Sequence, residues 1–221
     1  MSRNSIAIFG GTFDPVHHGH LRSALELKET LAVDELRLMP SHKPPLRDRP
    51  GASSELRLAM VADAIADEPG LAVEGRELQR SGPSYSAETL AELRQDCGPD
   101  VALIFIVGSD AFNQLHRWQD WRRIFDSAHL VVLERPEFPL AIAKEVEAFL
   151  APRWVDDRAA LLAEPCGNIH RLQLSQLAIS ATDIRRRIAD GLSIRYLLPE
   201  GVRRIINEQG LYRPESQETH H

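Results

Sequence analysis

Short apolar runs alternate with segments of helical periodicity along the chain, and this alternation restricts the fold more than any other feature. The most continuous apolar run, VALIFIVG at 101–108, is typical of a strand that is buried on both faces of a parallel sheet. We expect strands at 5–9, 35–40, 71–75, 101–108, 129–136 and 169–174. We expect helices at 19–31, 53–67, 84–96 and 180–190, and a final short helix after residue 199. This order predicts an α/β fold with a doubly wound, mainly parallel sheet, helices on both faces and a small C-terminal helical segment.

Length and composition narrow the class of protein further. The 221 residues suffice for one α/β domain, which we expect at 1–213, followed by a disordered tail at 214–221. The formal net charge of −6 argues against bulk nucleic-acid binding but leaves room for a local basic pocket that holds a small anion. No stretch approaches about 18 uninterrupted apolar residues, so we expect no membrane span. Cys97 and Cys166 form no CxxC pair, which favours a reducing cytoplasm and argues against a disulfide scaffold or a zinc ribbon.

The segment FGGTFDPVHHGH follows the first expected strand, at a place where parallel sheets bind ligands. Gly10 and Gly11 let the backbone approach an anion closely, and Gly19 opens a helix whose free amides favour negative charge. His17 and His20 are three residues apart, so both imidazoles would project to one side of the helix. There they could donate hydrogen bonds to phosphate oxygens, more strongly when protonated.

Two other interpretations of this segment stay open at this point. The same residues suit a tight turn with surface histidines, and composition alone does not separate that turn from a phosphate site. A zinc site would use His17, His18 and His20, but it lacks a nearby cysteine and an evident fourth ligand.

A second basic segment, ISATDIRRRIADG, begins with a capping sequence in which Ser180 and Asp183 are three residues apart. The three arginines that follow lie within the first two turns, where each cation opposes the helix dipole at a cost of about 0.3–1 kcal/mol. An anion held by Ser180, the free amides and Arg185 would resolve this conflict. The alternative is a solvated arginine run, which we expect for at least one of Arg186 and Arg187.

Both segments resemble signatures of the nucleotidylyltransferase superfamily. TFDPVHHGH is similar to the pattern [ST]-F-D-P-x-H-x-G-H, and the matching positions are Thr12, Phe13, Asp14, Pro15, His17, Gly19 and His20. ISATDIR is similar to IS-[ST]-T-x-I-R, with Ala181 where serine is often found. The resemblance implies a Rossmann-like fold in which the two histidines contact a nucleotide triphosphate and stabilise the transition state. It also implies that Ser180, Thr182 and Arg185 bind the triphosphate from the opposite side.

Two further segments resemble bacterial nicotinate-nucleotide adenylyltransferases. GPSYSAETL is similar to P-S-Y-[ST]-x-x-T-L, whose tyrosine and hydroxyl residue lie at the pyridine-nucleotide pocket; here these are Tyr85 and Ser86, with a plain capping turn as the alternative. GSDAFNQLHRW is similar to G-x-D followed by tryptophan eight residues later. The resemblance implies that Asp110 is a ligand on the ribose or adenosine side. It also implies that Trp118 stacks on the nicotinate ring, with a packed, partly buried aromatic as the alternative.

The proline-rich segment MPSHKPPLRDRP resembles the P-x-x-x-P-P-H-K pattern of the same family less closely. Its histidine and lysine precede the two prolines, and Arg47 stands at the position of the family's lysine. Either Lys43 or Arg47 is therefore expected to contact phosphate.

The resemblance implies an enzyme that transfers AMP from ATP to nicotinate mononucleotide, giving deamido-NAD and pyrophosphate in NAD biosynthesis. The implied catalytic residues are His17, His20 and Arg185. The implied ATP-binding residues are Gly10, Gly11, Thr12, Phe13, His17, His20, Gly108, Asp110, Ser180, Thr182 and Arg185. The implied nicotinate mononucleotide-binding residues are Thr12, Lys43, Arg47, Tyr85, Ser86 and Trp118. Mg²⁺ is the implied cofactor, bound mainly through ATP phosphates and water without protein ligands.

The expected partners are therefore the two small-molecule substrates, with no nucleic acid and no membrane, and the protein is expected to be a monomer or a homodimer. Transfer to nicotinamide mononucleotide or to another phosphate-bearing substrate is the alternative reaction. A regulatory module that binds nucleotide without turnover is the alternative class. Degenerate modules of that kind would be expected to lose His20 or the Ser/Arg motif, and both are intact here.

Overall fold

The computed structural model describes residues 4–42, 50–80, 82, 84–134, 139–175 and 177–214. The strands are β1 (Ser5–Gly11), β2 (Glu35–Pro40), β3 (Leu71–Val73), β4 (Ala102–Gly108), β5 (His129–Leu133), β6 (Trp154–Val155) and β7 (Ile169–Leu172). The α-helices are α1 (His18–Leu31), α2 (Ser54–Ile65), α3 (Ser86–Cys97), α4 (Ser109–Phe112), α5 (Ile124–Ser127), α6 (Lys144–Leu150), α7 (Arg158–Leu162), α8 (Ala181–Ala189) and α9 (Glu200–Glu208). Short 3-10 helices are η1 (Arg76–Gln79), η2 (Leu115–Arg117), η3 (Trp121–Arg123) and η4 (Ala151–Arg153). The predicted phosphate contacts of Lys43 and Arg47, and the predicted tail from residue 215 onward, lie outside the described residues.

The strands form one seven-stranded sheet in the order β3-β2-β1-β4-β5-β7-β6, and every described pair is parallel. The chain leaves β1 towards β2 and β3 and later returns to β4 on the other side of β1. The strand order therefore reverses between β1 and β4, as in doubly wound Rossmann-like sheets. The predicted α/β fold is confirmed.

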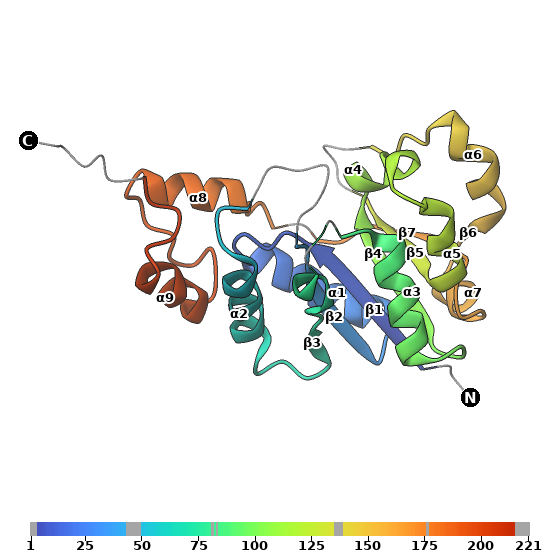
Figure 1. Cartoon of the computed structure of the whole chain (residues 1–221), viewed down its shortest axis with the longest axis horizontal. Coiled ribbons are helices and arrows are strands. Elements are labelled where there is room, and N and C mark those ends of the chain that lie inside the picture. Colours follow the sequence, from blue (N-terminus) through green and yellow to red (C-terminus); the bar gives the residue numbers. More distant parts are fainter. Residues whose placement is uncertain are drawn as a thin grey trace, which may run out of the picture.

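Alternate residues of β4 point into two separate hydrophobic clusters. Ile104 and Ile106 join the cluster to which α1, α2, α8 and α9 contribute. Leu103, Phe105 and Val107 join the cluster to which α3, α5 and α6 contribute. Figure 1 shows α8 and α9 beside α2 at one end of the molecule and α5 and α6 at the other. The strand at 101–108 is thus buried on both faces, as its continuous apolar sequence predicts.

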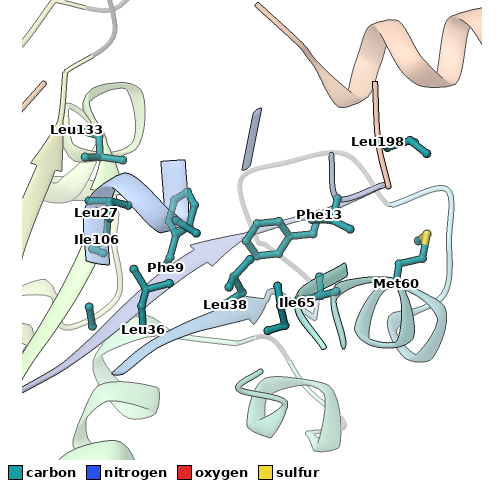
Figure 2. Packing of buried hydrophobic residues seen from close by; sticks show 14 of the residues in the cluster. Phe9, Phe13, Leu27, Leu36, Leu38, Met60, Ile65, Ile106, Leu133 and Leu198 are labelled. Carbon is teal, nitrogen blue, oxygen red and sulfur yellow. The ribbon is translucent and has the colours of Figure 1, made fainter. Parts of the chain in front are cut away.

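Phe13 anchors the loop after β1 to the first of these clusters. Its side chain is 1% exposed, and Figure 2 shows it leaving the end of β1 and entering the cluster that contains Leu38 and Ile65. A Cβ atom on Gly11 would lie 2.8 Å from Cζ of the Phe13 ring, so a side chain at position 11 would displace this ring. The loop is therefore attached to the core at its start.

Residues 140–168 hold elements that the sequence pattern does not predict, namely α6, β6 and α7. The strand β6 has two residues, and the helices α6 and α7 have seven and five. Helical periodicity is judged over windows of about 11–18 residues, so elements of this length give no clear pattern. The expected strand at 129–136 also ends earlier, at Leu133.

The predicted C-terminal helical segment consists of α8 and α9. Gly191 follows α8 with a φ of +69°, a conformation that glycine often adopts just after a helix end. In the part of the chain that the structure describes, no helix has both the length and the apolar character needed to span a membrane.

Candidate functional site

The loop between β1 and α1 lies where the strand order of the sheet reverses. β1 pairs with β2 on one side and with β4 on the other, and parallel strands end at the same edge of a sheet. Gly10 and Gly11 at the end of β1 and Gly108 at the end of β4 therefore share one edge, with Asp110 in the next turn. Ligands bind at this position in open parallel sheets. The topology thus brings together the two loops that the sequence marks for phosphate and adenosine.

His17 and His20 form a stacked pair at the start of α1. Their ring centroids are 3.7 Å apart and the ring planes are inclined by 22°. The edge-to-face contact of Phe13 with His20, at 5.0 Å between centroids, places the pair against the core. A Cβ atom on Gly19 would lie 3.0 Å from Cε1 and Nδ1 of His17, so a side chain at this position would disturb the stack. The prediction that the two imidazoles lie on one side is confirmed.

His17 is a neutral hydrogen-bond donor in this arrangement. His17 is 4% exposed. This burial, together with the nearby charge of His18, lowers the pKa of His17 to about 4. Nδ1 of His17 accepts the backbone N–H of His20 at 3.4 Å, so the single proton of the neutral ring lies on Nε2. In this tautomer, His17 donates only through Nε2–H. Near neutral pH, His17 therefore offers a phosphate oxygen one neutral N–H donor.

The zinc interpretation has no support in this geometry. Across the described segments, no group of three or more His, Cys, Asp or Glu side chains could hold a metal ion. Stacked, nearly parallel rings also direct their nitrogen lone pairs side by side, whereas zinc needs them to converge at about 2 Å.

Arg185 connects the start of α8 to the histidine loop. Its Nη1 donates to the backbone oxygen of Asp14 at 2.7 Å, and its Nη2 lies 3.4 Å from Oγ1 of Thr182. The backbone oxygen of Ile179 would lie 3.4 Å from a Cβ atom on Gly19, so the two segments are in close contact. The Arg185 side chain is still 36% exposed, which leaves donor groups available to a ligand. The structure thus brings together the two motifs that the sequence separates by about 160 residues.

The structure also shows the predicted cap of α8 and the contacts of its two other arginines. Oγ of Ser180 accepts the backbone N–H of Asp183 at 3.1 Å, so the predicted cap is present. Arg186 forms an ion pair with Asp183, and Nε of Arg187 donates to the backbone oxygen of Ser193 at 3.0 Å. Both contacts lie on α8 or on the turn after it. These contacts are consistent with the expectation that at least one of Arg186 and Arg187 belongs to a solvated run.

Trp118 is separated from the loop after β1 by one aromatic ring. It contacts Phe105 edge to face, at 6.3 Å between centroids. The Phe105 ring in turn lies 3.3 Å from where a Cβ atom on Gly10 would be. Trp118 is partly buried, which matches the packed-aromatic alternative and leaves part of the ring accessible for stacking.

Tyr85 and Ser86 begin α3. Tyr85 occupies the N-cap position without a side-chain capping hydrogen bond, and Ser86 is the first helical residue. The helix therefore begins without a side-chain cap from Tyr85. Both residues are partly buried.

The structure adds two residues that the sequence did not single out. Arg57 is 1% exposed and its Nη1 donates to the backbone oxygen of Thr12 at 2.7 Å. The hydroxyl of Tyr212 donates to Oδ1 of Asp14 at 2.7 Å. The sequence holds a sign of the Arg57 contact, since this cation lies three residues before Met60 on the apolar stripe of its helix. The sequence holds no such sign for Tyr212, because its partner Asp14 is 198 residues away.

Comparisons with known proteins agree with this geometry. Residues 8–187 match the family described as Cytidylyltransferase-like. A Chromohalobacter salexigens protein named "Probable nicotinate-nucleotide adenylyltransferase" is 48% identical over 208 residues, which cover 94% of this chain and 95% of that protein. A Methylococcus capsulatus protein of the same name is 47% identical over 208 residues, which cover 94% and 99%. The solved structure of Plasmodium falciparum nicotinic acid mononucleotide adenylyltransferase complexed with NaAD has a TM-score of 0.68 at 14% identity. That match covers 95% of this chain and 97% of the other, and it shows a shared fold.

Proposed function

This chain belongs to the cytidylyltransferase-like family and, within it, to the nicotinate-nucleotide adenylyltransferases, and from this premise we propose that it transfers AMP from ATP to nicotinate mononucleotide. The products are deamido-NAD and pyrophosphate. The observation that carries the proposal is the stacked imidazole pair of His17 and His20, which lies beside Arg185 at the switch point of the sheet. Such a cluster of donors suits the oxygens of a triphosphate.

The proposed reaction is an in-line displacement. An oxygen of the 5′-phosphate of nicotinate mononucleotide attacks the α-phosphorus of ATP, and the bond from this phosphorus to the oxygen that bridges to the β-phosphorus breaks. Pyrophosphate leaves with that electron pair. The nucleophile is already an anion, so no residue needs to form a covalent bond or act as a general base. Positioning and charge stabilisation supply the catalysis.

Five side chains carry the charge stabilisation in this proposal. Nε2–H of His17 and the imidazole of His20 donate to the α- and β-phosphate oxygens as charge moves to the leaving group. Arg185, with the hydroxyls of Ser180 and Thr182, holds the β- and γ-phosphates. The glycines at the end of β1, with Thr12 and Phe13, allow the backbone to approach the triphosphate.

Mg²⁺ fits this site as part of the nucleotide. The side chains that face the loop are hydrogen-bond donors, and the Asp14 carboxylate already accepts three hydrogen bonds. We therefore propose that the ion is held by the phosphates and by water rather than by protein carboxylates. When bound, it neutralises charge on the pyrophosphate group.

The nicotinate mononucleotide pocket is proposed at the start of α3 and at the turn before Trp118. Trp118 would stack on the nicotinate ring, and Tyr85, Ser86 and the amides at the helix start would meet the carboxylate. Asp110 would bind on the ribose side of ATP beyond Gly108. Either Lys43 or Arg47 would contact phosphate.

The proposal includes the cellular setting. We infer that residues 1–213 act as one domain, in the cytoplasm, as a monomer or homodimer without nucleic-acid or membrane partners. The two free cysteines, Cys97 and Cys166, support a reducing compartment.

A turnover assay tests the proposal directly. Purified protein with ATP, Mg²⁺ and nicotinate mononucleotide should release pyrophosphate and form deamido-NAD, and nicotinamide mononucleotide should be the poorer substrate. A preference for the amide would instead support the alternative reaction. Absence of pyrophosphate release with either nucleotide would support a non-catalytic nucleotide-binding module.

The roles of the histidines are tested by a matched pair of variants. His20→Ala should lower kcat by about 10² or more, as expected for loss of a transition-state contact. His18→Ala also removes an imidazole from the start of α1, but it lies at the variable position of the motif and should keep nearly normal kcat. Equal effects of the two variants would contradict the assigned roles.

A further inference from the structure

Three distant segments hold the backbone between β1 and the histidine pair. Arg57, from α2, donates to the backbone oxygen of Thr12 at 2.7 Å. Arg185, from α8, donates to the backbone oxygen of Asp14 at 2.7 Å. Tyr212, from the chain after α9, donates to the side chain of the same Asp14 at 2.7 Å. The loop that carries the imidazole pair thus depends on contacts from residues 45, 171 and 198 positions away in the sequence.

Asp14 is the point at which Arg185, Tyr212 and the segment before α2 meet. The residue is 4% exposed, and its carboxylate accepts the backbone N–H groups of Gly51 and Ala52 at 2.8 and 3.0 Å as well as the Tyr212 hydroxyl. Nη1 of Arg185 also lies 3.9 Å from Oδ2 of Asp14. Three donors and a nearby cation compensate for removing this carboxylate from water. Removing one donor would leave part of that compensation missing.

The position of Tyr212 is tightly defined. Its backbone has a φ of +63°, a left-handed conformation that is uncommon for a residue with a Cβ atom. Its ring packs on Gly51, where an added Cβ atom would lie 3.1 Å from Cδ1 and Cε1 of the ring. Burial and the hydrogen bond to Asp14 raise the pKa of Tyr212, so the hydroxyl keeps its proton as a donor. These features aim one hydroxyl at one carboxylate oxygen.

We propose that Tyr212 is a positioning residue for AMP transfer. By holding Asp14, it fixes the positions of Arg185 and of the imidazole pair. Only the expected change in kcat rests on the proposed function; the positioning of the loop does not. Tyr212 does not touch the phosphates in this assignment. It holds the Asp14 side chain, and the backbone oxygen of the same residue receives the Arg185 guanidinium.

The test is Tyr212→Phe, which removes a single oxygen atom. The kcat per folded molecule should fall about fivefold or more, while KM for nicotinate mononucleotide should stay within about twofold, because only transition-state positioning is lost. Tyr196→Phe is the matched control, since Tyr196 is 83% exposed and lies in the turn between α8 and α9. If Tyr212→Phe lowers the melting temperature but leaves kcat per folded molecule unchanged, its role is structural and the proposal is overturned.

A second readout separates this proposal from the identity of the reaction. The imidazole NMR signals of His17 and His20 in the protein without nucleotide should move or broaden in Tyr212→Phe and not in Tyr196→Phe. Spectra that superpose on the wild type would overturn the positioning role whatever reaction the enzyme performs. In an Arg185→Ala background, the effect of Tyr212→Phe on kcat should largely disappear, because the two residues act on the same loop. Full additivity would also overturn the proposal.

Discussion

Acidification from pH 7.5 to 5.5 is expected to destabilise the protein through His17. Burial, with the charge of His18 adding to it, lowers the pKa of His17 from 6.5 to about 4. In the unfolded chain the same imidazole regains its ordinary pKa, so the unfolded state binds more protons than the folded state. Stability attributable to this group is therefore present above about pH 6.5 and is lost as the pH falls towards about 4.

The size of the effect at pH 5.5 follows from this difference. About nine-tenths of unfolded chains carry a proton on this imidazole at that pH, whereas the folded protein keeps it neutral. Proton linkage then gives a loss of about 1.3 kcal/mol in the free energy of unfolding between pH 7.5 and pH 5.5. For a domain with an ordinary stability of about 5–15 kcal/mol, such a loss is readily measured.

Urea unfolding of the wild type and of His17→Asn at both pH values isolates the contribution of His17 to the free energy of unfolding. Asparagine keeps an acceptor at the N-cap position but does not titrate, and other groups affect both proteins alike. The difference in unfolding free energy between the two proteins should change by about 1.3 kcal/mol between the two pH values. The control is His116→Asn, which removes an exposed imidazole and leaves the contribution of His17 in place. An unchanged difference between wild type and His17→Asn would refute the neutral, buried state of His17.

Substitutions at three further positions test the geometry of the site. Gly19→Ala places a Cβ atom 3.0 Å from the His17 ring and should lower kcat about tenfold or more in a turnover assay; wild-type kcat would show that the stack is not needed. Ser180→Ala removes the α8 cap and should lower the free energy of unfolding in urea by about 1 kcal/mol, whereas Ser180→Asn should restore most of it. Trp118→Ala should raise KM for nicotinate mononucleotide with little change in KM for ATP, and the opposite pattern would move the pocket elsewhere.

Local sequence patterns predicted the features that depend on neighbours along the chain. The buried strand at 101–108, the Ser180 cap and the placement of His17 and His20 on one side of α1 are set by spacings of a few residues. The meeting of Arg185 with the loop after β1 required the family resemblance, because nothing local relates the two segments.

Other features depend on tertiary packing and could not be predicted in this way. The neutral state of His17 results from burial beneath the assembled loop, which no spacing encodes. The contact between Asp14 and Tyr212 joins residues near opposite ends of the chain. Buried Arg57 is an intermediate case, since a cation on an apolar stripe indicates an internal partner without identifying Thr12. The substrate contacts of Tyr85, Ser86 and Trp118 stay predictions.

The hydrogen bond from Tyr212 to Asp14 also has a consequence for biosynthesis. The ribosome makes residue 212 a full 198 residues after residue 14, and domains generally begin to fold from the N-terminal side as the chain emerges. During translation the histidine loop therefore exists without one of the three hydrogen bonds on its central carboxylate. Full catalytic competence is then expected only after Tyr212 has left the ribosome, and messages truncated a few codons before residue 212 would yield folded but poorly active enzyme.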